Sequence, residues 1–91
     1  MEFEWDPRKS EANWKKHGVR FEEAMEAFYD PHGVDIFDPD SVNEIRFRLI
    51  ALSSKRLLMV GYTIRREEIF RIITARKATA YETRYYNASN G

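Results

Sequence analysis

The sequence predicts a single α+β domain in which an antiparallel sheet carries helices on one face, in the order β-α-α-β-β-β-β-α. The 91-residue chain is long enough for one modest core and too short for two. Two helix patterns with clear start and stop signals lie in the first third, and four strand-like segments follow. The connections between these segments are short, which favours antiparallel hairpins.

A short strand and a capped helix open the chain. Residues 3–5 alternate between apolar and acidic side chains, as in a strand. Asp6 is suited to cap a helix and Pro7 to occupy its first position, so we expect a helix over residues 7–17. Gly18 would end this helix in the left-handed conformation.

A second helix is expected over residues 20–29 and a strand over residues 34–37. The helix is indicated by an apolar stripe at helical spacing, formed by Phe21, Ala24, Met25 and Phe28. Turn-forming residues separate the two elements.

Three further strands and a closing helix are expected in the second half. Residues 44–52 alternate between apolar and charged side chains. Residues 56–64 are apolar on both faces, which is typical of a buried central strand. Residues 68–74 are expected to form the last strand and residues 75–86 the closing helix.

Composition narrows the class of protein. The chain has no cysteine, so it offers neither disulfides nor a Cys-based metal site. It contains no apolar leader and no membrane-length segment, so we expect a cytoplasmic protein with no membrane partner. The HExxH spacing, the P-loop, the dinucleotide fingerprint and the nucleophile elbow are all absent. No cofactor and no metal site are therefore expected.

The net charge is zero overall but divided along the chain. Residues 1–44 hold twelve acidic against five basic side chains, a charge of −7, and residues 45–91 hold ten basic against three acidic ones, a charge of +7. Eight of the ten are arginines, whose guanidinium groups bind phosphate oxygens in pairs. The alternative is a basic surface that pairs with the acidic half. Arg66 and Arg84 are expected to be ordinary surface charge.

Chemistry on phosphates is the catalytic class that remains. A metal-independent ribonuclease needs a base near the ribose 2′-OH, cations that stabilise the phosphorane and an acid for the leaving oxygen. The candidate cations are Arg46, Arg48, Arg65, Arg71 and Arg76, of which Arg46 and Arg48 fall on the polar side of their strand.

The candidate acids and bases are His17, Glu44 and Tyr62, and each has a structural alternative. His17 is suited to bond the carbonyl groups at a helix end, Glu44 to form an ion pair, and Tyr62 to pack in the core. Trp5 and Trp14 are candidates for base stacking, with anchoring of the helix layer as the alternative.

Several motifs occur together and in order along nearly the whole chain. In the first half they are Phe3-Glu4-Trp5-Asp6, Lys9, Asn13, Lys16-His17-Gly18-Val19 and Phe21-Glu22-Glu23-Ala24. In the second half they are Glu44-x-Arg46, Gly61-Tyr62-Thr63-x-Arg65, Arg71-Ile72-Ile73-Thr74-Ala75-Arg76-x-Ala78 and Glu82. Together these motifs resemble the BrnT family. Thr74 stands where serine is usual, and Ser53-Ser54 replaces a glycine-containing turn.

The resemblance implies that residues 1–91 form a single BrnT-like domain with the fold of RelE-like ribonuclease toxins. It implies the toxin of a bacterial type II toxin–antitoxin system, an endoribonuclease that inhibits translation and is neutralised by a BrnA-like antitoxin of the ribbon-helix-helix type. The implied complex is a 2:2 heterotetramer that contacts operator DNA only through the antitoxin.

The resemblance also implies roles for individual residues. The expected catalytic residues are Arg65, Arg76, Arg46, His17 and Glu44, and the expected RNA-binding residues are Arg48, Arg71 and Tyr62. Two alternatives stay open at this point. One is a non-catalytic module that binds nucleic acid or protein, and the other is a degenerate toxin that retains only antitoxin binding.

Overall fold

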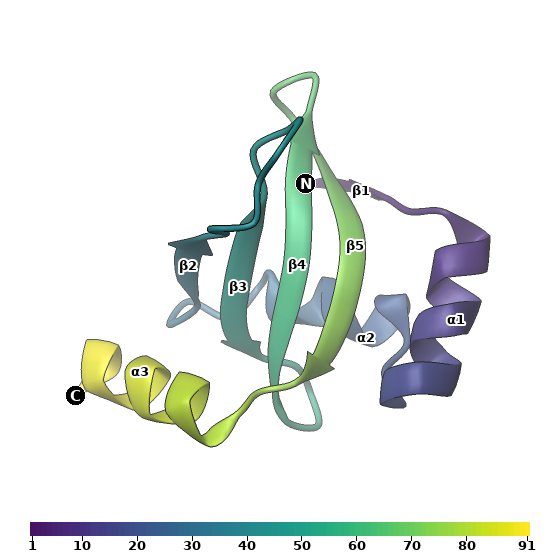
Figure 1. Cartoon of the computed structure of the whole chain (residues 1–91). Helices are drawn as coiled ribbons and strands as arrows, with labels where there is room; N and C mark the ends of the chain where they lie inside the picture. Colours follow the sequence, from purple (N-terminus) through teal and green to yellow (C-terminus); the bar gives the residue numbers. More distant parts are fainter.

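The structure, a computed structural model that describes residues 1–91, contains one five-stranded sheet and three helices (Figure 1). In chain order the elements are β1 (Glu2–Glu4), α1 (Pro7–His17), α2 (Phe21–Ala27), β2 (Val34–Phe37), β3 (Phe47–Leu52), β4 (Leu57–Arg65), β5 (Ile69–Lys77) and α3 (Ala80–Asn90). The predicted α+β class and the predicted element order are confirmed. None of the three helices is long and apolar enough to cross a membrane.

The strands lie in the order β1-β5-β4-β3-β2, and one pair departs from the antiparallel pattern. The strands β2 to β5 pair antiparallel, as the short connections predict. The first strand, β1, instead pairs parallel with β5, in a register that sets Glu4 beside Arg71. No hairpin joins β1 to β5, so connection length did not constrain their relative direction.

The sequence predicts that all helices lie on one face of the sheet, but in the structure they lie on both faces. Residues of α2 pack against the face that carries Leu49 and Val60. Tyr86 of α3 packs against Ile50 and Met59, whose side chains alternate to the opposite face. Figure 1 shows α2 behind the sheet and α3 in front of its lower end.

The end of β5 and the start of α3 differ most from the prediction. The helix was expected from Ala75, but residues 75–77 continue β5 and pair with β4. The helix begins only after Thr79, whose side chain accepts from the Glu82 N–H while the Glu82 carboxylate accepts from the Thr79 N–H. Pairing with β4 therefore overrides local helix preference, and Arg76 lies on a strand.

Two smaller boundary differences also bear on function. The helix α2 ends at Ala27, two residues earlier than predicted. The strand β3 begins at Phe47, so Glu44 and Arg46 lie in the loop that precedes it rather than within the strand.

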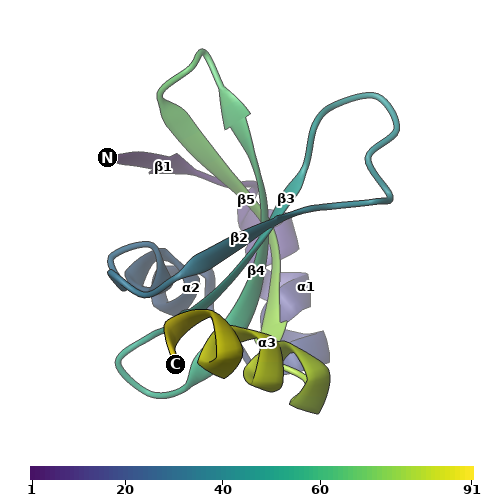
Figure 2. The same cartoon turned by 90° about the vertical axis from the view of Figure 1, so that its left-hand side faces the viewer.

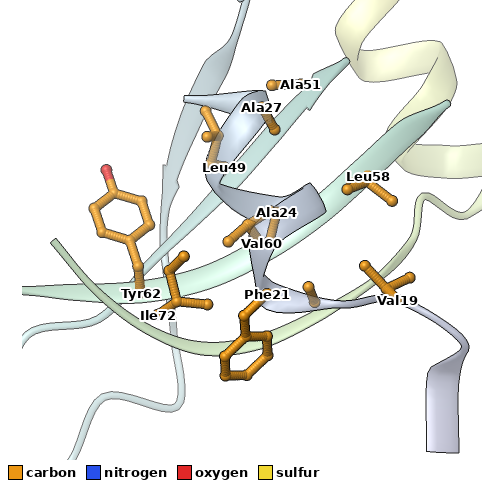
Figure 3. Packing of buried hydrophobic residues seen from close by; sticks show 11 residues of the cluster. Val19, Phe21, Ala24, Ala27, Leu49, Ala51, Leu58, Val60, Tyr62 and Ile72 are labelled. Atoms are coloured by element: carbon orange, nitrogen blue, oxygen red, sulfur yellow. The ribbon is translucent and has the colours of Figure 1, made fainter. Parts of the chain in front are cut away.

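The main core lies between α2 and the sheet (Figure 3). Phe21 is fully buried there, a burial worth about 1.5–3 kcal/mol for a side chain of this size. Trp5 packs edge-on against Phe21 at 6.0 Å between ring centres, as expected for an anchor of the helix layer. Trp14 is half exposed, and the Arg20 guanidinium lies 4.1 Å from its ring centre.

A buried amide joins α1 to the sheet. The Asn13 Nδ2 group donates to the carbonyl oxygens of Val19 at 2.8 Å and Ala75 at 2.9 Å. Its Oδ1 atom accepts from the Ala75 N–H at 3.0 Å and from the Thr74 hydroxyl at 3.2 Å. One side chain thus satisfies backbone groups of β5 and of the segment that follows α1.

We predict that Asn13→Ala lowers the free energy of unfolding by about 2–4 kcal/mol, because it leaves buried backbone groups of Ala75 and Val19 without partners. Urea denaturation measures this loss. Asn87→Ala on the exposed side of α3 is the control, with a change within about 0.5 kcal/mol. Equal stability of the two variants would contradict this account of how α1 docks.

Candidate functional site

Arginines gather on the face of the sheet opposite α2. Strand alternation places Leu49, Val60 and Ile72 in the core, and so turns Arg48 and Arg71 to the other face. By the same alternation, Arg65 at the end of β4 also lies on this face, as does Ile69 of β5, with which it pairs. The helix α3 covers only one end of this face. The β4–β5 turn and the β2–β3 loop project at the other end (Figure 2).

Three arginines and two carboxylates form a continuous ion-pair network at this uncovered end. We name it the Arg65 cluster, and its members are Glu4, Glu44, Arg46, Arg65 and Arg71. A Glu4 oxygen lies 2.6 Å from Arg71 Nη1 and 3.9 Å from Arg65 Nε. The Glu44 oxygens lie 3.8 Å from Arg65 Nη2 and 3.5 Å from Arg46 Nε. The cluster therefore keeps a formal charge of +1.

Different parts of the fold position the two carboxylates of the cluster, Glu4 and Glu44. The parallel pairing of β1 with β5 sets Glu4 directly beside Arg71. The loop that carries Glu44 is fixed to β4, because the buried Thr63 hydroxyl donates to the Ile45 carbonyl at 2.7 Å. Backbone groups at the base of the loop close it, since the Asp38 N–H donates to the carbonyl of residue 46 at 2.9 Å.

A shallow pocket of about 370 Å³ opens beside the cluster, lined by Glu4, Glu44, Arg65 and Arg66. Arg66 and Glu67 are the central residues of the β4–β5 turn, with φ of 52° and 66°. Hairpin turns of this kind favour Asn and Gly, because each other residue in the left-handed region costs about 1–2 kcal/mol.

No three His, Cys, Asp or Glu side chains are grouped so that they could hold a metal ion.

Arg76 lies apart from the cluster, where β5 meets α3. Its two terminal nitrogens donate to the Glu82 carboxylate at 2.8 and 3.0 Å. Burial raises the pKa of Glu82, but hydrogen bonds from Arg76 and from the Thr79 N–H outweigh it and hold that pKa below its ordinary value. Arg76 thus holds α3 against the sheet.

The pairing of the basic half with the acidic half is extensive. Five arginines of the second half form ion pairs with carboxylates of residues 1–44, namely Arg46, Arg48, Arg56, Arg65 and Arg71. Arg56 binds Glu23 on the α2 side of the sheet, and Arg48 binds Asp38 and Asp40 of the β2–β3 loop. The structure therefore agrees with the alternative that composition left open, in which the basic half pairs with the acidic half.

Residues 5–82 match the family model described as "Ribonuclease toxin, BrnT, of type II toxin-antitoxin system". The chain belongs to the BrnT family. The fold agrees with this assignment: the crystal structure of the Brucella abortus ribonuclease toxin, BrnT, matches with a TM-score of 0.60 and 22% sequence identity, over 87% of this chain and 97% of that chain. No curated protein sequence matches the chain.

Membership confirms the resemblance inferred from the motifs. BrnT proteins are ribonuclease toxins of type II toxin–antitoxin systems, in which the toxin has an antitoxin as its partner. The BrnT motif Glu44-x-Arg46 and the Arg65 that follows the Gly-Tyr-Thr strand meet in the Arg65 cluster, although about twenty residues separate them in the sequence.

Of the three acid–base candidates in this BrnT chain, only Glu44 lies with the arginines. Tyr62 is 5% exposed on the α2 side, and its hydroxyl donates to Asp35 at 2.7 Å. Burial and this hydrogen bond raise the pKa of the Tyr62 phenol well above its ordinary value. Tyr62 is therefore a core residue, and its position gives no support to a role in RNA binding.

His17 is the last residue of α1. Figure 1 shows α1 ending toward the lower end of the sheet, whereas the β4–β5 turn is at the upper end. The His17 side chain forms no ion pair and no hydrogen bond. Arg76 bonds only Glu82 and the Lys77 carbonyl, so it contacts no member of the Arg65 cluster. The expected catalytic residues are thus divided between two ends of the sheet.

Glu4 is the cluster residue that sequence reasoning did not select. Its role depends on the parallel pairing of β1 with β5, which the sequence did not indicate. Its presence in the first BrnT motif was the one available signal. Thr63 was missed for a similar reason, because its contact with Ile45 crosses from one strand to the loop before the neighbouring strand.

We predict that Glu82→Gln lowers the free energy of unfolding by about 1–3 kcal/mol at pH 7, because the charged pair with Arg76 is lost. The folded-state pKa of Glu82 is lowered, so its contribution is present above the ordinary glutamate value of about 4.3 and is lost as the pH falls through the folded value. The difference from the parent should therefore shrink as the pH falls below the ordinary glutamate value.

Urea unfolding at a series of pH values measures this difference. Glu22→Gln at an exposed position of α2 serves as the control and should stay within about 0.5 kcal/mol of the parent at every pH. A Glu82→Gln deficit that does not change with pH would contradict the assigned ion pair.

Proposed function

We propose that this chain is an endoribonuclease toxin that cleaves RNA without a metal ion and thereby inhibits translation in the cytoplasm. The observation that carries the proposal is a carboxylate, Glu44, held between the guanidinium groups of Arg46 and Arg65 on an uncovered face of a BrnT-family chain. This arrangement supplies the base and the cations that cleavage of a phosphodiester by its own 2′-OH requires, and water supplies the acid.

In the proposed mechanism the Glu44 carboxylate takes the proton of the ribose 2′-OH. The 2′-oxygen then forms a bond to phosphorus, and the bond from phosphorus to the 5′-oxygen breaks. The leaving 5′-oxygen takes a proton from water, and Glu44 later returns its proton to water. The products are a 2′,3′-cyclic phosphate and a 5′-hydroxyl end.

The arginines would stabilise the negative charge that grows on the phosphorane oxygens. The distances from Glu44 to Arg46 and Arg65, 3.5 and 3.8 Å, are loose for charged pairs. Since each guanidinium carries five N–H donors, both arginines keep donors for a phosphate. Arg71, bound closely by Glu4, and Arg48 are proposed to contact the RNA strand on either side.

Arg76 and His17 match family positions, but we propose no contact of either with the reacting phosphate. Arg76 would support the site from a distance by holding α3. For the antitoxin we propose a BrnA-like ribbon-helix-helix protein in a 2:2 complex that contacts operator DNA through the antitoxin. Type II membership supports this proposal.

We predict that Arg65→Ala lowers kcat/KM for RNA cleavage by about 100-fold or more, because it removes a cation that acts on the transition state. The same variant should remain folded and bind the antitoxin. Cleavage of a defined oligonucleotide and growth after induction measure the effect. Arg84→Ala, at an exposed helix position without an ion pair, is the control and should cleave like the parent.

The other outcomes are informative. Equal cleavage by Arg65→Ala and the parent would refute the site assignment. A parent protein that shifts RNA without shortening it would be a non-catalytic binding module, and one that binds only the antitoxin would be a degenerate toxin. Full loss of parent activity on addition of EDTA would refute metal independence.

A further inference from the structure

Arg66 is the one arginine lining the pocket beside the Arg65 cluster that has no ion pair. The pocket is lined by Glu4, Glu44, Arg65 and Arg66. Arg65 lies within 4.0 Å of both carboxylates, whereas no carboxylate lies within that distance of Arg66. All of the donors of the exposed Arg66 guanidinium are therefore available to an incoming anion.

The backbone at Arg66 is held in an unfavourable conformation. Arg66 and Glu67 both have positive φ, 52° and 66°. They are the central residues of a turn in which the Glu68 N–H donates to the Arg65 carbonyl at 3.2 Å. Glycine or asparagine would adopt this turn with less strain. A long cationic side chain on a strained turn, next to the Arg65 cluster, points to a functional role for Arg66.

The turn geometry also fixes where Arg66 is presented. Arg65 is the last residue of β4 and Ile69 the first of β5, and the two pair across the sheet. Three residues, 66–68, connect them, and this short turn carries Arg66 to the margin of the pocket next to Arg65. An exposed cation without an ion pair, beside arginines that are already paired with carboxylates, is suited to hold a second phosphate of a bound strand.

We propose that Arg66 is a substrate-positioning residue that contacts a backbone phosphate of the bound RNA strand next to the phosphate on which Arg65 acts. This inference rests on the proposed function of the Arg65 cluster. It assigns to Arg66 a role that its sequence context, a pair of arginines followed by two glutamates in a turn, did not indicate.

The test separates the charge of Arg66 from the strain of its backbone. Arg66→Gln removes the charge and keeps the strain, with Arg84→Gln as the matched loss of an exposed charge elsewhere. Arg66→Gly removes both, with Glu67→Gly as the matched relief of strain at the neighbouring residue. Binding of a 2′-O-methyl oligonucleotide, which lacks the attacking hydroxyl, is followed by fluorescence anisotropy across a salt series. Cleavage of the matching RNA and thermal unfolding are measured in parallel.

We expect both Arg66 variants to bind more weakly than Arg84→Gln and to lower the slope of log K against log salt by about 0.7, the value for one lost phosphate contact to a single strand. Cleavage should fall mainly through a higher KM. Arg66→Gly and Glu67→Gly should both melt a few degrees higher than the parent, so that Arg66→Gly is more stable and yet less active.

Affinity and salt slope of Arg66→Gln equal to those of Arg84→Gln would overturn the inference. Unchanged melting of both glycine variants would overturn its argument from strain. A parent that binds the oligonucleotide without cutting RNA would refute the proposed function, while the comparison of Arg66 with Arg84 would still decide the inference. A parent that does neither would overturn both.

Discussion

The candidate site depends on two carboxylates, Glu4 and Glu44, that come from the acidic first half of the chain and lie among arginines of the second half. Three guanidinium groups brought together without them would repel one another and spread apart. With the carboxylates in place, Arg46, Arg65 and Arg71 have defined neighbours before any substrate arrives. Such preorganisation is what electrostatic catalysis requires, since groups already in position need not reorganise during the reaction.

The same pairing limits how strongly the surface attracts nucleic acid. Exposed ion pairs are individually weak, so most of their consequence here is for geometry and local charge rather than for stability. The Arg65 cluster keeps a formal charge of +1, and the unpaired Arg66 beside it adds one more. A chain with zero net charge can thus present a small cationic site without the broad positive surface that binds any polyanion.

Local signals predicted much of the fold. Asp6, Pro7 and Gly18 gave the bounds of α1, because cap and turn residues act within a few positions. Alternation placed Arg48 on the uncovered face. What the sequence did not indicate depends on contacts between distant segments: the parallel pairing of β1, the extension of β5 through Arg76 and the position of α3 on the second face. Such contacts bring Glu4 and Thr63 to the site. Tyr62 lies in the core because its strand, β4, is apolar on both faces.

The most direct test of the central claim is to observe the arginine side chains while RNA binds. Nε–Hε resonances recorded by NMR during titration with a non-cleavable 2′-O-methyl oligonucleotide report each guanidinium separately. The account predicts large changes at Arg46, Arg65 and Arg71, and none at Arg56, which binds Glu23 on the α2 side of the sheet. Changes concentrated at Arg56, or spread equally over all arginines, would contradict it.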